Sequence, residues 1–233
     1  CVLFVTSIQR SRTVVLAIDT EKGQVMGEGN TGANESWSLI GAGGGALVAS
    51  VSAPGRRPSV HIFRMSSALD PAFTRVHDPK YWAPVYEPSG SGEGEGGSSS
   101  DCTASVLATG SFESILLEPA GGSDTVLLVP HGGPHSAHIF AWNLQYEFLL
   151  RLGGYSLLLV NYRGSVGFGN DDLLSLPGHV GDHDVKDCMA ALDAALAQRK
   201  ALKKVGVMGG SHGGFLTLHL LGQHPDRFDV GVV

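Results

Sequence analysis

Several kinds of sequence feature are scarce in this chain of 233 residues, and each scarcity narrows the possible functions. No apolar run reaches the roughly 20 residues of a transmembrane helix, and the first residues lack the basic start of a signal peptide. Basic residues are in the minority, with 16 Lys and Arg against 22 Asp and Glu and a formal net charge of -6. Because phosphates are bound by basic surfaces, we expect neither nucleic acid nor a membrane as the partner.

Cysteine is also rare. Cys1, Cys102 and Cys188 are widely spaced and form no C-x-x-C pair, which indicates neither a disulfide framework nor a zinc site. Free cysteines are typical of a reducing compartment, so we expect a cytoplasmic protein. The chain starts with cysteine in the middle of an apolar alternation, and we therefore expect it to be part of a longer protein.

Short apolar runs separated by polar or glycine-rich turns fill residues 1–65, which predicts antiparallel β structure of a sandwich, barrel or propeller. Within it, Gly41–Ala46 matches the dinucleotide-binding pattern G-x-G-x-x-A, but a strand rather than a helix follows it, so we interpret it as a hairpin turn. Residues 88–101 are of low complexity, "PSGSGEGEGGSSSD", and have the composition of a flexible linker.

Strand and helix patterns alternate in the second half of the chain, and this alternation predicts a mostly parallel sheet with helices on both faces. Apolar runs predict strands over 112–119, 125–132 and 155–164, and a further strand ahead of residue 209. Helical spacing predicts helices over 136–153, over 182–200 and after residue 212. The apolar face of the helix over 182–200 consists of Val185, Cys188, Met189, Leu192, Ala195 and Leu196.

The segment Gly209-Gly210-Ser211-His212-Gly213 matches G-x-S-x-G between a predicted strand and a predicted helix, the context of a nucleophile elbow. A sharp strand-to-helix turn exposes the serine hydroxyl, and glycines at 209 and 213 keep the turn free of side chains. We therefore predict that Ser211 is a nucleophile and that the amide of His212 stabilises an oxyanion. The alternative is a glycine-rich turn with a serine that takes no part in chemistry.

The segment His131-Gly132-Gly133-Pro134-His135 follows another predicted strand and is similar to the HGGG-type loop that supplies a second oxyanion donor. We expect that donor to be the amide of Gly133. A metal site of His131, His135 and His138 lacks the H-E-x-x-H spacing, so His135 and His138 are expected at a helix start and on the surface.

Two further segments leave their roles open. In "NYRGSVGFGND", residues 161–171, Tyr162 and Arg163 either line a ligand site at the edge of the sheet or pack structurally beneath the elbow. The segment Gly181-Asp182-His183-Asp184 has a faint likeness to binuclear metal sites, but its place at a helix start indicates a structural role.

The segments "PHGGPH", "NYRGSVGFG" and "GGSHGGF", in this order, resemble the S9 prolyl-oligopeptidase family of serine peptidases, with "SLPGHVGDHDVKD" strengthening the likeness. The resemblance implies an α/β fold: residues 1–87 as the last antiparallel blades of a β-propeller, 88–104 as a linker, and 105–233 as the N-terminal part of an α/β-hydrolase domain. It implies release of N-acylated amino acids from short peptides by a Ser-Asp-His triad, no cofactor, a cytosolic location and a homo-oligomer.

The triad partners of Ser211 are not apparent in this chain. Asp226 and Asp229 follow Ser211, but no histidine follows them, and His219 and His224 lie in the predicted helix after the elbow. The resemblance places the acid and the base beyond Val233, so we expect the isolated chain to be nearly inactive. An esterase or lipase of the same fold, and a truncated product without catalysis, stay as alternatives.

Overall fold

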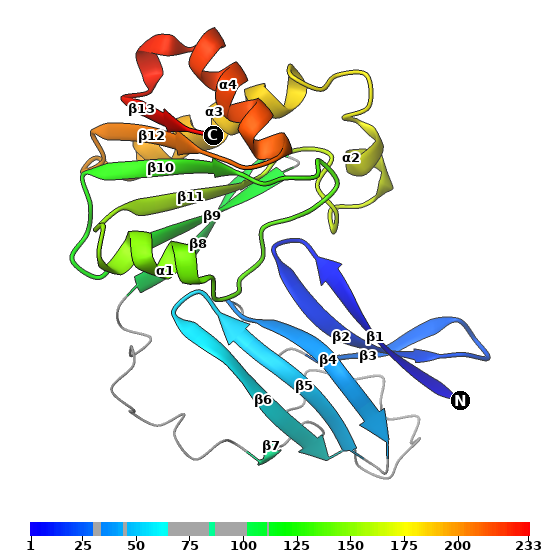
Figure 1. Ribbon diagram of the computed structural model, residues 1–233. Helices are drawn as coiled ribbons and strands as arrows, with labels where there is room; N and C mark the ends of the chain where they lie inside the picture. The colour runs from blue at the N-terminus through cyan, green and yellow to red at the C-terminus, as the bar shows by residue number, and fades with distance from the viewer. Residues whose placement is uncertain (30–33, 44–45, 65–83, 87–101, 111) are drawn as a thin grey trace. The chain divides into compact units, whose positions relative to one another are not determined.

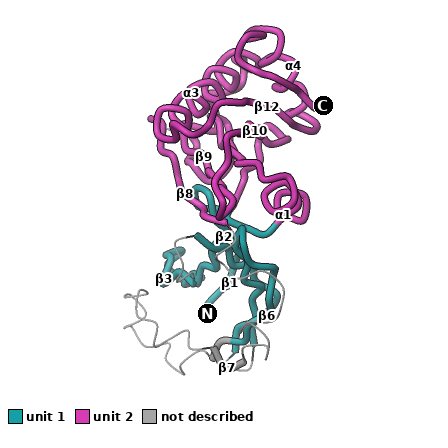
Figure 2. The backbone as a smooth tube through the Cα atoms, turned by 90° about the vertical axis from the view of Figure 1, so that its left-hand side faces the viewer, with its two compact units in different colours: residues 1–98, 140–142 teal, residues 99–139, 143–233 magenta. Residues whose placement is uncertain are grey.

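The computed structural model describes residues 1–29, 34–43, 46–64, 84–86, 102–110 and 112–233 (Figure 1). The chain forms two compact units, residues 1–98 with 140–142 and residues 99–139 with 143–233 (Figure 2). Most of the predicted linker, residues 88–101, lies outside the described residues.

The first unit consists of two antiparallel sheets, as the alternation of short apolar runs predicts. One sheet has the order β1-β2-β3 and the other the order β4-β5-β6-β7. The strands are β1 (Val2–Gln9), β2 (Arg12–Asp19), β3 (Gln24–Gly29), β4 (Ser36–Gly43), β5 (Ala46–Ala53), β6 (Arg56–Arg64) and β7 (Pro84–Tyr86). Val15 of β2 shares one buried cluster with Trp37 of β4 and Leu47 of β5, so apolar contact joins the two sheets. Gly41–Gly43 end β4 and Ala46 begins β5, and the two strands pair antiparallel up to Gly43 and Ala46, which confirms a hairpin rather than a nucleotide-binding turn.

The second unit contains one six-stranded sheet of order β13-β12-β10-β11-β9-β8. Its strands are β8 (Cys102–Thr109), β9 (Phe112–Pro119), β10 (Thr125–Pro130), β11 (Ser156–Asn161), β12 (Lys204–Met208) and β13 (Val230–Val232). The four strands β13, β12, β10 and β11 are parallel, as expected, whereas β9 and β8 run antiparallel at one side of the sheet. All six residues of β11 are buried, which explains its continuous apolar sequence.

Helices cover the sheet, with α1 and α3 on opposite sides of it (Figure 2). The helices are α1 (Leu144–Arg151), α2 (Asn170–Leu174), α3 (His183–Gln198), α4 (His212–Gln223) and the 3-10 turn η3 (Pro225–Arg227). The predicted apolar face of α3 is buried against the strands together with Leu216 and Leu220 of α4, and only Leu196 is partly exposed. Among the residues that the structure describes, no helix combines the length and the apolar character of a membrane span.

The prediction of a helix over 136–153 is wrong in its first half, because α1 begins only at Leu144. The side chain of Asn143 accepts hydrogen bonds from the amides of Gln145 and Tyr146, so it caps the helix at that point. Upstream, the amide of His138 donates to the side chain of Asn161 at 2.7 Å, which holds this part of the chain as a loop. Tertiary hydrogen bonding therefore overrides the helical spacing of residues 136–143.

The strand order places two loops side by side at the carboxyl edge of the sheet. From β10 the chain passes through α1 to β11 on one side, and then through α3 to β12 on the other side of β10. Such a reversal of strand order opens a crevice for ligands at the carboxyl ends of the two central strands. Here the crevice lies between the loop after β10, which starts at His131, and the turn after β12, which contains Ser211.

Candidate active site

Ser211 lies at a strained turn between β12 and α4. Its φ of 56° and ψ of -126° are unusual for a residue other than glycine, and its side chain is exposed. A Cβ atom on Gly209 would collide with the carbonyl oxygen of Gly213, and a Cβ on Gly213 would collide with that of Pro130. The two motif glycines are therefore required by the close approach of the backbone, as the elbow pattern predicts.

The loop after β10 lies directly against this turn. A Cβ atom built on Gly132 would lie 3.4 Å from the Cβ of Ser211 and 3.8 Å from its Oγ. The next residue, Gly133, has a φ of 128°, a conformation that favours glycine. Pro134 follows, and its carbonyl accepts a 2.9 Å hydrogen bond from the amide of Ser136, which closes the loop. The structure thus brings together the two glycine-rich motifs, although they are about eighty positions apart in the sequence.

The side chain of His131 holds the glycine-rich loop in place by a hydrogen bond to its backbone. Its Nδ1 lies 2.7 Å from the carbonyl oxygen of Gly132, and because a carbonyl only accepts, the ring nitrogen donates. The C=O and N–H of a peptide group point in opposite directions, so this bond directs the amide of Gly133 away from the ring. Burial, with a smaller contribution from the nearby His212, lowers the pKa of His131 to about 4. The imidazole is therefore uncharged at neutral pH.

Tyr162 supports His131 in turn. The two rings stack with centroids 4.3 Å apart, and the tyrosine hydroxyl donates a 2.8 Å hydrogen bond to the carbonyl of His131. Ser165 contacts the other ring nitrogen of His131 at 2.7 Å. Tyr162 and Ser165 are both fully buried, and burial raises the pKa of the tyrosine well above its usual range. Tyr162 is thus a support beneath the loop and does not line an open site.

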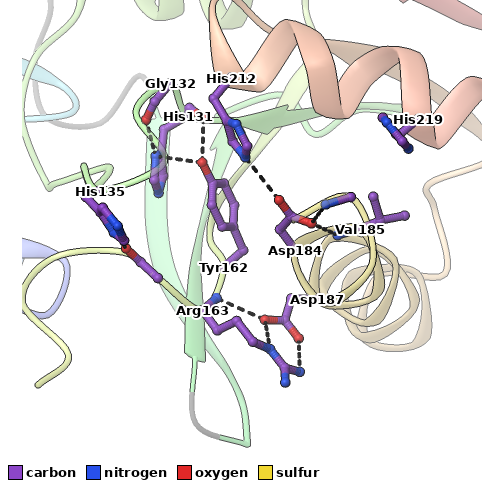
Figure 3. Close-up of polar contacts among 12 residues, drawn as sticks. His131, Gly132, His135, Tyr162, Arg163, Asp184, Val185, Asp187, His212 and His219 are labelled. Atoms are coloured by element: carbon purple, nitrogen blue, oxygen red, sulfur yellow. Dashed lines mark hydrogen bonds and ion pairs between the residues drawn. The ribbon is translucent and has the colours of Figure 1, made fainter. Parts of the chain in front are cut away.

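Arg163 packs structurally, the second of the two roles that its motif left open. Its guanidinium makes two hydrogen bonds to Asp187 on α3, at 2.8 and 2.6 Å, and its amide makes a third at 2.9 Å (Figure 3). Asp187 is 2% exposed, so the pair is largely removed from water on the carboxylate side. The interaction holds the pKa of Arg163 above its usual value.

The imidazole of His212 points from the start of α4 to Asp184 on α3 (Figure 3). Its Nε2 lies 3.0 Å from a carboxylate oxygen of Asp184, whose side chain is completely buried. From the sequence we expected Asp184 only at a helix start, without a connection to the elbow. The available signal in the sequence was spacing, because Asp184 lies four positions before Cys188 of the predicted apolar face and three before Asp187.

The expectations for two other histidines were only partly correct. His138 does not start a helix and is half-buried: its Nε2 donates to the carbonyl of Val129 at 3.0 Å, and burial lowers its pKa to about 3. His135 is exposed, with its ring bonded to the carbonyl of Gly164 at 2.8 Å. In the described part of the chain, no three His, Cys, Asp or Glu side chains are grouped as metal ligands.

No base contacts the Ser211 hydroxyl within the described residues. His219 lies farther along α4, where it bonds Gln223 at 2.9 Å and packs against Phe215. A cavity of about 380 Å³ lies beside the glycine-rich loop, between the ends of β10, β12 and β13 and the start of α1. Its wall includes His131, Gly132, Tyr146 and Gly210.

Two family models each match a part of the chain. Residues 139–233 match the model of the "Prolyl oligopeptidase family", and residues 1–83 match "Acylamino-acid-releasing enzyme, N-terminal domain". The chain is 38% identical to the acylamino-acid-releasing enzyme of Mus musculus and 37% identical to that of Homo sapiens, over 96% and 95% of its length. In both cases it spans only 31% of the relative, about a third of that protein.

Solved structures agree on the fold. The chain superposes on an acylaminoacyl peptidase of Pyrococcus horikoshii with a TM-score of 0.74 at 17% identity, over 98% of this chain and 35% of the other. An acylaminoacyl peptidase in complex with Z-Gly-Gly-Phe-chloromethyl ketone gives a TM-score of 0.73 at 18% identity, over 98% of this chain and 34% of that one.

Proposed function

The chain belongs to the prolyl oligopeptidase family of serine peptidases, and from that premise we propose that it is part of an enzyme that releases an N-acylated amino acid from the N-terminus of a short peptide. The relatives that match nearly all of this chain are acylamino-acid-releasing enzymes, and this likeness supports the substrate class. The substrate would be a short acylated peptide, and the bond broken would be the first peptide bond after the acylated residue.

One observation carries the proposed mechanism: the strained, exposed Ser211 faces the glycine-rich loop at Gly132 across a distance of a few ångströms. In the proposed reaction the oxygen of Ser211 attacks the scissile carbonyl and forms a tetrahedral oxyanion. The amides of His212 and Gly133 are the proposed donors to that oxyanion, the first at the positive end of α4 and the second aimed by His131.

We propose that the general base of Ser211 is a histidine that lies outside residues 1–233. In the α/β-hydrolase fold the acid and the histidine follow the nucleophile in the chain. On this proposal residues 1–233 alone hold a nucleophile and an oxyanion hole without a base, and they would be slower than the complete enzyme by a factor on the order of thousands.

The first unit is proposed to be the end of a β-propeller, within residues 1–87, followed by the linker at 88–104 and the hydrolase domain from 105. Two consecutive antiparallel sheets with neighbouring strands in chain order have the form of propeller blades, and the match of residues 1–83 to the N-terminal domain of acylamino-acid-releasing enzymes supports this assignment. A cytoplasmic location and a homo-oligomeric state complete the proposal.

The function is tested with the complete gene product, so that all sequence outside residues 1–233 is present. We expect hydrolysis of an N-acetyl-amino-acid p-nitroanilide to exceed that of a short acyl ester in kcat/KM, and fluorophosphonate to label Ser211. Ser211→Ala should abolish turnover and labelling, whereas Ser136→Ala, an exposed serine of the facing loop, should retain both. A preference for the ester would favour an esterase, and absence of labelling in the complete protein would contradict the proposed function.

A further inference from the structure

The buried carboxylate of Asp184 is the one acidic group that touches the elbow residue His212 in the described structure. It is 0% exposed and accepts three hydrogen bonds. One oxygen accepts from the amides of Gly181 and Val185, at 2.8 and 3.0 Å, and the other lies 3.0 Å from Nε2 of His212. Because an ionised carboxylate only accepts, Nε2 of His212 carries the proton in this bond.

We propose that Asp184 is a positioning residue for the oxyanion hole, acting through the His212 imidazole on the His212 amide. The inference rests on the proposed function, because it assigns a task to the same amide. Nε2 is the far end of the ring, so a bond there fixes both side-chain torsions of His212 and, through Cβ, the direction of its Cα. That Cα belongs to the peptide group that would donate to the oxyanion.

The rest of the ring is held by packing. The imidazole lies 5.3 Å from the ring of Phe215 and 5.9 Å from that of Tyr162, measured between centroids. Its side chain is only 11% exposed. Phe215 has no polar atom, and the hydroxyl of Tyr162 is directed to the carbonyl of His131, so Asp184 is the group that bonds Nε2 and selects one orientation of the ring.

Asp187, a second buried carboxylate on α3, helps to hold the helix in the position from which Asp184 bonds His212. Residues three apart on a helix share a face, and Asp184 and Asp187 therefore point to the same side of α3. Asp187 binds Arg163 in the turn after β11, whereas Asp184 binds His212 in the turn after β12 (Figure 3). In the sheet these two strands flank β10, so the first turns of α3 bridge the loops on both sides of the glycine-rich loop.

The support continues to the second proposed oxyanion donor. The turn that Asp187 holds includes Tyr162, which donates to the carbonyl of His131, and His131 in turn bonds the carbonyl of Gly132. One helix thus contacts the elbow directly through Asp184, and it supports the glycine-rich loop through Arg163, Tyr162 and His131. On this proposal the contacts of Asp184 and of Asp187 together set the separation between the amides of His212 and Gly133. That separation matters because a displacement of about 1 Å in a reacting group costs roughly a hundredfold in rate.

Asp184→Asn is the informative substitution, since it keeps the shape of the side chain and one oxygen for the amides of Gly181 and Val185. In the complete protein, with an N-acetyl-amino-acid p-nitroanilide, we expect kcat to fall about 10- to 100-fold with KM within about twofold of wild type. Asp182→Asn is the matched control: it removes the same charge from the same helix start, but the side chain of Asp182 is 53% exposed and pairs with Lys186 and His183. The control should retain kcat within about twofold.

His212→Phe approaches the same contact from the other side, because it retains an aromatic ring between Phe215 and Tyr162 and loses Nε2. We expect a similar fall in kcat, and a double variant no slower than the slower single variant, since both changes remove one interaction. If the two losses multiply in the double variant, Asp184 does not act through His212 and the inference is overturned. If Asp184→Asn lowers the amount of folded protein, this comparison of the single and double variants still tests whether Asp184 acts through His212.

A spectroscopic measurement separates positioning from a general structural role. In wild-type protein labelled with ¹⁵N-histidine, the His212 ring should carry its proton on Nε2, and Asp184→Asn should change the nitrogen shifts of that ring. An unprotonated Nε2 in the wild type overturns the inference. So does fluorophosphonate labelling of Asp184→Asn as fast as that of Asp182→Asn. Failure of the wild-type protein itself to label at Ser211 overturns the proposed function, and the inference with it.

Discussion

The hydroxyl of Tyr162 donates a 2.8 Å hydrogen bond to the carbonyl of His131 while the two rings stack with their centroids 4.3 Å apart. This contact joins the turn after β11 to the loop that faces Ser211. It explains why a tyrosine in a fully buried position retains its hydroxyl, since the oxygen replaces water as the partner of a buried carbonyl.

Tyr162→Phe tests this contact. The ring stack stays, but the carbonyl of His131 loses its donor, so we expect a loss of about 1 to 2 kcal/mol in the free energy of unfolding. We also expect kcat to fall about tenfold, because the loop that carries Gly133 is less well held. Urea unfolding and steady-state kinetics measure the two effects. Tyr155→Phe, at a tyrosine that is 36% exposed, is the control; equal effects of both substitutions would contradict the assignment.

Gly132→Ala tests the close approach of the glycine-rich loop to the nucleophile. The added methyl group would lie 3.4 Å from Cβ and 3.8 Å from Oγ of Ser211, so it would occupy space that a substrate carbonyl needs. We expect the rate of fluorophosphonate labelling to fall at least tenfold with a small change in melting temperature. Gly121→Ala, where a methyl group meets nothing within 4 Å, should label at the wild-type rate.

Substitution by alanine should affect the stability of the protein very differently at two glycines of the elbow motif, Gly213 and Gly210. A methyl group on Gly213 would collide with the carbonyl of Pro130, and the backbone on both sides is fixed by α4 and β10. Gly213→Ala should therefore cost about 2 to 4 kcal/mol in the free energy of unfolding. Gly210→Ala introduces a methyl group into open space and should change stability by less than about 0.5 kcal/mol. Denaturant titration of both variants provides the comparison.

The buried histidines predict a loss of stability in mild acid. The pKa values of His131 and His138 are lowered to about 4 and about 3, against 6.5 for an exposed histidine. Between these values the unfolded chain binds protons that the folded chain does not, so stability falls as the pH decreases from about 6.5 towards 4. Each histidine contributes a slope of up to about 1.4 kcal/mol per pH unit.

Urea unfolding of the complete protein from pH 7.5 to pH 4.5 measures this slope. His138→Gln removes one titrating group and retains a donor for the carbonyl of Val129, so the slope should decrease. His135→Gln, in the same loop but exposed, controls for the replacement of a histidine at this place. A slope in His138→Gln as steep as in His135→Gln would show that burial of His138 does not govern the acid response.

Sequence patterns predicted most elements of the second unit because the signals are local. The strand Ser156–Asn161 is buried at every position and apolar from Leu157 to Val160, since both faces of a parallel strand are covered, and the apolar face of α3 follows the helical period. The elbow was also predicted from a local pattern, G-x-S-x-G between a strand and a helix. Only the collision that requires Gly209 is local, however, because Gly213 approaches Pro130 at the end of another strand, β10.

The start of α1 could not be predicted in this way. Residues 136–143 have helical spacing, but the amide of His138 bonds the side chain of Asn161, which is 23 positions away. The roles of Tyr162 and Arg163 stayed open for the same reason, since their partners, His131 and Asp187, lie 31 and 24 positions from them.

The sequence by itself therefore determined the two kinds of β structure, the alternation of strands and helices, and the position of Ser211 in a turn that only glycines permit. Tertiary structure alone decided which groups support that turn. The order of strands β12, β10 and β11 brings Gly132 against Ser211 and lays α3 behind both neighbouring loops, so that Asp184 meets His212 across 28 positions. Contacts of this kind depend on how the chain crosses the sheet, and that path is set by the packing of whole elements and not by any local pattern.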